Sequence, residues 1–168
     1  MWNEYYPGQS YSYEHKTRER INILSGQFFV HDILFSCLKT QIICLNGSKS
    51  DKLLVAQSLF DSNSGGYDFG GNIFQSNGSS VHYRICCIKS SYSTGPGYLD
   101  YARTIKADVS LKCLIKDSTF SQCGTYVGPF VIYDNYNHII TNTTSSHNTG
   151  SFGNCAGAIA RWKSSKII

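Results

Sequence analysis

The sequence predicts an all-β fold, a right-handed parallel β-helix of about five coils with a loose N-terminal arm or cap. Two observations carry this prediction. Short apolar runs are broken by clusters of Ser, Asn, Gly and Asp, which are strong turn formers. A motif that consists of an aromatic residue, a polar turn residue and a glycine-led strand recurs along the chain, as in a solenoid of stacked repeats. The right hand follows from the general rule for parallel crossover connections.

The composition also favours β-structure. The 168 residues include 12 Tyr and 9 Phe, and charged residues make up 15% of the chain, against roughly 25% in an ordinary soluble domain. Aromatic and β-branched side chains fit the pleated surface of a sheet. The formal net charge of +4 is mild, and basic residues form no stripe with interleaved aromatics, so we expect no nucleic-acid binding.

The chain divides into two parts. Residues 1–20 are polar and rich in tyrosine, and neither a period of 2 nor a period of 3.6 organises them. We expect them to form a loose arm or a cap over the first coil. Residues 21–168 hold the repeats and are expected to form the parallel β-helix domain. Terminal coils need polar caps, and none is evident after Ala160, so we expect this domain to be incomplete at its C-terminus.

The repeat is clearest around Phe60, which is followed three residues later by Asn63 and then by a strand that begins at Gly71. Alignment by the aromatic residue places the repeat anchors at Phe35, Phe60, Tyr92 and Phe120, with Ser145 in the fifth copy. The turn position after the anchor is occupied by Asn63, Cys123 and Asn148, and a later glycine-led strand begins at Gly157.

This repeated motif predicts how the coils stack. The anchors are expected to face the core, and strands of successive coils are expected to pair in parallel about 4.8 Å apart. The residue at the turn position is expected to adopt a left-handed backbone, which asparagine tolerates, and to hydrogen-bond like residues in the coils above and below.

The sequence Phe-Asp-Ser-Asn at residues 60–63 has the form FxxN, and Gly-Gly-Asn-Ile at residues 70–73 has the form GGxI. These resemble the paired FxxN and GGA[ILV] motifs of the chlamydial polymorphic membrane proteins and their relatives in trichomonad-type protists. The resemblance covers roughly residues 28–160. It implies a β-helical, adhesin-like surface protein, with this chain as part of a longer extracellular or cell-surface protein.

Parallel β-helices also host enzymes that cleave polysaccharides. Glycoside hydrolysis needs two carboxyl groups about 5 to 9 Å apart. Asp32 and Asp117 share a repeat position but lie three coils apart, roughly 14 Å by strand spacing. His82 and His138 are expected in corresponding strands two coils apart, and the sequence nominates no third metal ligand near them. We expect no catalytic residue, metal or cofactor, and a polysaccharide lyase or glycoside hydrolase is the alternative.

The seven cysteines contain no CxxC pair, which disfavours a zinc ribbon. Buried cysteines that pack as small hydrophobic residues are one interpretation. The other is a disulfide between neighbouring coils that joins Cys87, or its neighbour Cys86, to Cys113, and it requires an oxidising compartment. Sequons begin at Asn46, Asn77 and Asn142, which are candidate glycosylation sites consistent with secretion.

The N-terminus lacks the basic and apolar regions of a signal peptide. The apolar runs are far shorter than the ~20 residues that cross a bilayer, so we expect no membrane insertion by this segment.

Tyrosines in or near the predicted strands have two interpretations, which are packing within the core and an exposed strip that binds a glycan or a host or cell-surface protein. They are Tyr83, Tyr92, Tyr98, Tyr101, Tyr126, Tyr133 and Tyr136. We expect a non-enzymatic β-solenoid interaction module of a surface or secreted adhesin-like protein. A degenerate structural repeat without a binding role is a further alternative.

Overall fold

The computed structural model describes residues 1–15, 21–23, 25–39, 42–46, 48–63, 73–76, 78–88, 100–103, 108–123, 131–133, 136–147, 160–163 and 166–167. Within these residues the chain forms one short helix, α1 (Trp2–Tyr5), and is otherwise built of short strands. Every pairing between these strands is parallel. The chain is therefore mostly strands in parallel sheets, as an all-β fold requires.

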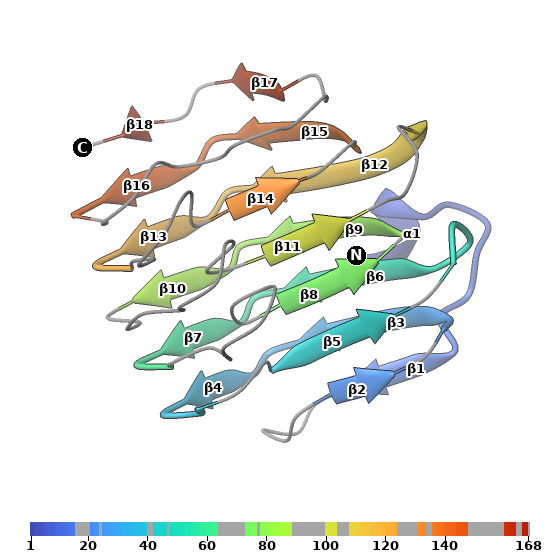
Figure 1. Ribbon diagram of the computed structural model, residues 1–168, viewed down its shortest axis with the longest axis horizontal. Coiled ribbons are helices and arrows are strands. Elements are labelled where there is room, and N and C mark those ends of the chain that lie inside the picture. Colours follow the sequence, from blue (N-terminus) through green and yellow to red (C-terminus); the bar gives the residue numbers. More distant parts are fainter. Residues whose placement is uncertain are drawn as a thin grey trace.

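The strands form three sheets (Figure 1). The first sheet contains, in spatial order, β1 (Tyr13–His15), β3 (Gln27–His31), β6 (Lys52–Ala56), β9 (Ser79–Tyr83), β12 (Asp108–Lys116), β15 (Tyr136–Thr141) and β17 (Ala160–Lys163). The second contains β4 (Leu34–Ser36), β7 (Leu59–Asp61), β10 (Cys86–Ile88), β13 (Thr119–Ser121), β16 (Thr144–Ser146) and β18 (Lys166–Ile167). The third contains β2 (Ile21–Ile23), β5 (Ile43–Asn46), β8 (Ile73–Ser76), β11 (Asp100–Arg103) and β14 (Val131–Tyr133).

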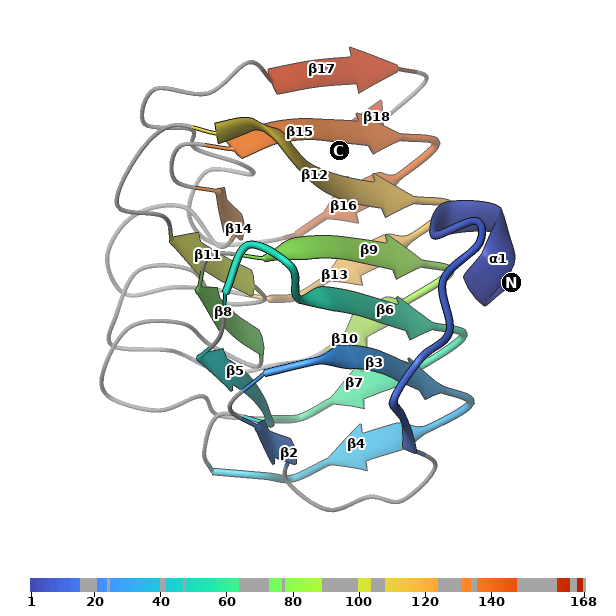
Figure 2. The ribbon, with the colours of Figure 1, turned by 90° about the vertical axis from the view of Figure 1, so that its right-hand side faces the viewer.

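The chain visits the sheets in a repeating order. From β2 to β16 it passes from the third sheet to the first, then to the second, and then back to the third. We call one such passage a coil. Each strand therefore pairs with strands one coil away, and the sheets grow by stacking from β2 and β4 toward β17 and β18 (Figures 1 and 2).

Equivalent residues of successive coils stack in register. In the second sheet Phe35 pairs with Phe60, and the rings stack with centroids 5.2 Å apart. The column continues through Cys87, Phe120 and Ser145. Phe35, Phe60, Cys87 and Phe120 are fully buried, so three of the predicted aromatic anchors lie in the core.

The predicted anchor at Tyr92 is wrong, because Cys87 occupies the column between Phe60 and Phe120. Tyr92 itself lies outside the described residues. Alignment by aromatic residues passed over Cys87, the column residue of the third coil, and selected the next aromatic residue along the chain instead. Strand pairing, and not side-chain similarity, sets the register.

Strand pairing also sets the register of β9, the first-sheet strand that precedes β10 in the same coil. His82 pairs with Val55 on one side and with Ile115 on the other, and Ile115 pairs with Ile140. His82 is fully buried in this column. His138 pairs with Cys113, two residues away from the His82 position. The two histidines therefore lie in corresponding strands two coils apart, as predicted, but at different positions of those strands.

A residue with a left-handed backbone follows each of five first-sheet strands. These residues are Asp32, Gln57, Arg84, Asp117 and Asn142, with φ between 48° and 55°. The next residue is often a buried hydroxyl. Ser58 Oγ accepts a hydrogen bond from the Ile33 amide of the preceding coil at 3.4 Å and donates to Ala56 O at 2.8 Å. Ser118 makes the equivalent bonds.

A second left-handed turn follows the second-sheet strands. Its residues are Cys37, Ser62, Gln122 and His147. The left-handed residue is therefore Ser62 and not the predicted Asn63, which follows it. The Asn63 side chain instead donates to Phe35 O at 3.0 Å and accepts from the Leu38 amide at 2.9 Å. It bonds two backbone groups of the preceding coil, one in β4 and one just after it, and so links the two coils at the turn.

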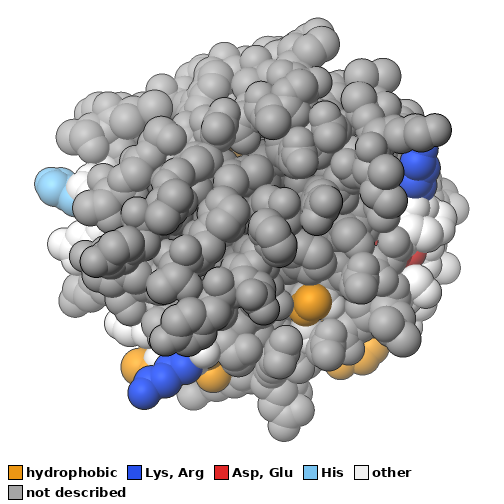
Figure 3. All heavy atoms as spheres, in the orientation of Figure 1, with side chains coloured by type: hydrophobic (Ala, Val, Ile, Leu, Met, Phe, Trp, Pro, Cys, Tyr) orange, Lys and Arg blue, Asp and Glu red, His pale blue; other side chains and the backbone are white. Residues whose placement is uncertain are grey.

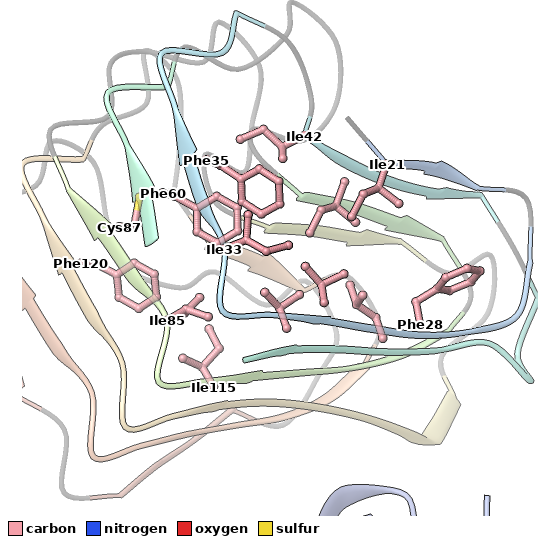
Figure 4. Packing of buried hydrophobic residues seen from close by; sticks show 14 of the residues in the cluster. Ile21, Phe28, Ile33, Phe35, Ile42, Phe60, Ile85, Cys87, Ile115 and Phe120 are labelled. Atoms are coloured by element: carbon pink, nitrogen blue, oxygen red, sulfur yellow. The ribbon is translucent and has the colours of Figure 1, made fainter. Parts of the chain in front are cut away.

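Buried apolar residues form two clusters. The larger lies between the three sheets and contains the Phe35, Phe60 and Phe120 column together with residues such as Ile85 and Ile115 (Figure 4). The smaller includes Leu54, Val81 and Leu114 together with Trp2 and Tyr6 of the N-terminal segment. Leu53 and Leu54 are consecutive in β6 but belong to different clusters, so β6 is buried on both faces, as is usual in parallel sheets.

Candidate functional site

Part of the outward face of the first sheet is covered by residues 1–15, which we call the N-terminal segment. Its helix α1 lies beside this sheet (Figure 2), and its strand β1 pairs with β3 at the sheet edge. The predicted arm at residues 1–20 therefore includes a strand of the first sheet, and residues 16–20 lie outside the described part. This segment places several aromatic side chains against the sheet.

Hydrogen bonds fix the segment in place. The Tyr6 hydroxyl lies 3.0 Å from Leu53 O and 3.2 Å from Ser79 O, on two neighbouring strands. Trp2 Nε1 donates to Gln9 O at 2.7 Å, which folds the segment back on itself. Gly8 has φ of +71° in the connecting turn, a backbone conformation that favours glycine.

The aromatic rings of the segment contact one another and the sheet. Trp2 lies 4.7 Å from Tyr6 and 5.6 Å from Tyr11 between ring centroids, the latter edge-on. Tyr11 lies 5.5 Å from Phe29, which stacks on His31 at 4.2 Å. Trp2 and Tyr6 are buried, whereas Tyr11 is 40% exposed. The cluster thus has a packed base on the sheet and an open aromatic edge.

A pocket of about 670 Å³ opens beside this edge. It is lined by Met1, Trp2, Asn3, Gly8, Gln9, Ser10, Tyr11 and Phe29. Its volume falls in the range of small-molecule sites. The lining side chains are aromatic, aliphatic, amide or hydroxyl groups, and none of them carries a charge. The pocket therefore offers ring faces and hydrogen-bonding groups to a neutral ligand.

His31 links the segment to the sheet close to this pocket. Its Nε2 lies 2.7 Å from Glu14 Oε1 of β1, and its Nδ1 lies 2.7 Å from Asp32 Oδ2. A ring that carries protons on both nitrogens donates to both carboxylates. This arrangement joins β1 to the end of β3 and orients the ring on which Phe29 stacks.

Tyr83 extends the aromatic face along the first sheet. The Tyr5 ring lies 5.8 Å from it, and the guanidinium of Arg84 and the ammonium of Lys116 lie over it at 5.0 and 5.5 Å. Burial, together with the nearby carboxylate of Glu4, raises the pKa of Tyr5, so its hydroxyl stays protonated at neutral pH.

The predicted tyrosine strip is not a single surface. Tyr83 lies in β9 and Tyr136 in β15 of the first sheet, whereas Tyr101 and Tyr133 lie in β11 and β14 of the third. Side chains are described only for Tyr83 among these. Tyr92, Tyr98 and Tyr126 lie outside the described residues. Sequence reasoning missed the N-terminal aromatics, whose signal was five aromatic residues, Trp2, Tyr5, Tyr6, Tyr11 and Tyr13, within the first thirteen.

The carboxylates considered for catalysis lie in the turn after the first-sheet strands. Asp32 and Asp117 occupy equivalent left-handed positions, and Gln57 and Arg84 occupy the same position of the two coils between them. Within the part of the chain that the structure describes, no group of three or more His, Cys, Asp or Glu side chains could hold a metal ion.

Cys87 and Cys113 lie in different sheets, in β10 and β12, and the Cys113 side chain lies outside the described part. The Cys87 sulfur lies 3.1 Å from that of Cys123. The Cys86 side chain is partly exposed on the opposite face of β10, and burial is the main cause that raises the pKa of its thiol. The disulfide predicted for Cys87 and Cys113 stays a prediction.

The remaining predicted residues fall into two groups. Asn142 is exposed and donates to Asp117 Oδ1 at 2.6 Å, and Asn46 is the last residue of β5. Asn77, Asn148, Gly71 and Gly157 lie outside the described residues. On the face drawn in Figure 3, the described basic side chains are separate groups near the rim.

No family model matches this sequence, and neither a curated protein nor a solved structure matches it. Within the described residues, no helix has the length and apolar character needed to span a membrane.

Proposed function

We propose that the chain is a right-handed parallel β-helix that acts as a non-enzymatic interaction module, and that its aromatic pocket binds a neutral glycan. The repeating path through three parallel sheets supports the β-helix, because each return to a sheet is a crossover through the other two. Such crossovers are right-handed in nearly all known cases.

The observation that carries the glycan proposal is the lining of the pocket. Trp2, Tyr11 and Phe29 present aromatic surface, while Asn3, Gln9 and Ser10 supply amide and hydroxyl groups. A sugar ring has apolar C–H faces and a rim of hydroxyl groups, so it matches both kinds of group at once. A cationic ligand would find no carboxylate among the lining side chains.

The same lining supports binding without cleavage. Glycoside hydrolysis needs two carboxyl groups on either side of the bond, and the pocket lining includes no carboxyl side chain. The resemblance to β-helical surface proteins is consistent with a module of an adhesin-like surface or secreted protein. In that setting the glycan would belong to a host or cell-surface glycoprotein or glycolipid.

A glycan array followed by a fluorescence titration tests this function. Trp2 lines the pocket, so a bound neutral glycan should change its emission. Tyr11→Ala should weaken binding about tenfold through loss of ring stacking. Tyr13→Ala is the matched control, because Tyr13 is 42% exposed in the same segment but does not line the pocket.

Two results would contradict the proposal. One is equal affinity of wild-type protein and Tyr11→Ala for every glycan that binds. The other is release of reducing or unsaturated sugar from a polysaccharide, which would support the enzymatic alternative.

A further inference from the structure

Two buried cysteines stand where other coils have a different residue type, one in the third coil and one in the fourth. Their side chains are in contact. Cys87 takes the place of an aromatic ring in the column Phe35, Phe60, Cys87 and Phe120. Cys123 follows Phe120 by three residues, as Asn63 follows Phe60. Asn63 donates to Phe35 O in the preceding coil, and the Cys123 thiol donates to Cys87 O in the preceding coil at 3.3 Å.

The two sulfur atoms lie 3.1 Å apart. Cys87 is 0% exposed and Cys123 is 1% exposed, and both belong to the core cluster between the sheets. The Cys123 thiol contacts both the carbonyl oxygen and the sulfur of Cys87, so the two side chains meet at the column position that holds no ring. An asparagine at position 123 would keep the bond to Cys87 O but would bring no second sulfur.

From this geometry we infer that Cys87 and Cys123 are a cross-linking site, at which a disulfide joins the third coil to the fourth. The inference does not depend on the glycan proposal. Closing the bond, about 2.05 Å long, requires the sulfurs to approach by roughly 1 Å. The link would fix two neighbouring coils at the core position where an aromatic contact is missing.

The oxidant is a low-molecular-weight disulfide such as oxidised glutathione. The thiolate of one cysteine attacks it, forms a mixed disulfide and releases one small thiolate. The second cysteine thiolate then attacks the protein sulfur of the mixed disulfide and releases the other small thiolate. The two cysteine protons end on the two released thiols, so one disulfide is reduced for each disulfide formed. Since both thiols are buried, the exchange takes place while the coils are stacking.

Peptide mapping of the full chain tests the inference. The protein is refolded with oxidised and reduced glutathione, alkylated after denaturation, and cut with trypsin and chymotrypsin. Trypsin leaves Cys86 and Cys87 on one peptide, residues 85–89, so the map is made on two matched variants. Cys86→Ser should retain a cross-link to the peptide that carries Cys123, and Cys87→Ser should lose it.

Thermal unfolding provides a second readout. The cross-link closes a loop of 36 residues, and its reduction should lower the Tm of the wild-type chain and of Cys86→Ser by about 10 °C. Cys123→Asn, which restores the residue type found at position 63, should show no redox dependence. Separate alkylation of Cys87 and Cys123 in the refolded wild-type chain, or a cross-link from either to another cysteine, would overturn the inference. Where a variant does not fold, fragmentation of the cross-linked wild-type peptide by tandem mass spectrometry identifies whether Cys86 or Cys87 carries the link.

Discussion

At the scale of single residues, the coils are held in register by buried polar side chains where strands end. Ser58 and Asn63 are both buried, and each bonds a backbone group of the preceding coil. A buried backbone group without a partner costs free energy comparable to a lost hydrogen bond. These side chains therefore continue the pairing between coils through the turns that separate the sheets.

This role predicts the effect of removing one hydroxyl. Ser58→Ala should leave the buried Ile33 amide without the acceptor that it has in the native turn, and the free energy of unfolding should fall by about 1–2 kcal/mol. Urea denaturation measures this loss. Ser36→Ala is the control, because Ser36 is exposed in the adjacent strand β4. Equal stability of the two variants would show that the Ser58 bond contributes nothing.

The sequence predicts residue roles only where the repeat is regular. Phe35, Phe60 and Phe120 were identified correctly as stacked core residues, because aromatic side chains recur there. The same rule failed at Cys87, where a small residue keeps the register through backbone pairing alone. The left-handed position was misplaced by one residue, because Ser62 and not Asn63 adopts it. The prediction rested on the tolerance of asparagine for this backbone, whereas the Asn63 side chain bonds the preceding coil.

At the scale of elements, the N-terminal segment determines whether the pocket exists. Seven of the eight lining residues belong to residues 1–11, and the eighth is Phe29 of β3. The segment is held by packing of Trp2 and Tyr6 and by the hydroxyl of Tyr6. Sequence periodicity could not predict this, because its rings pack one at a time on a sheet formed by residues far along the chain.

The attachment of the segment predicts a local effect. Tyr6→Phe removes the only group of that side chain that reaches Leu53 O and Ser79 O, and it should lower stability by about 1 kcal/mol. Hydrogen exchange followed by mass spectrometry should show faster exchange in residues 1–15, with the second sheet unchanged. Tyr11→Phe, which alters an exposed ring of the same segment, should leave exchange as in the wild type.

At the scale of the whole molecule, the stacked coils form three parallel sheets, and the N-terminal segment packs on the first of them. The parallel strands were predictable, because short apolar runs separated by turn residues recur at intervals that suit stacked coils. The proposed binding face could not be predicted, because the tyrosines that the sequence singled out lie, where described, in two different sheets. The site arises from contact between the start of the chain and the outward side of the first sheet, which no local pattern records.

A crystal structure of the full chain grown with the best glycan from the array tests the central claim most directly. We predict right-handed coils with Cys87 stacked between Phe60 and Phe120, and a sugar ring against Trp2 and Tyr11. An aromatic residue from positions 91–99 in place of Cys87, or a sugar bound away from the N-terminal segment, would contradict this account.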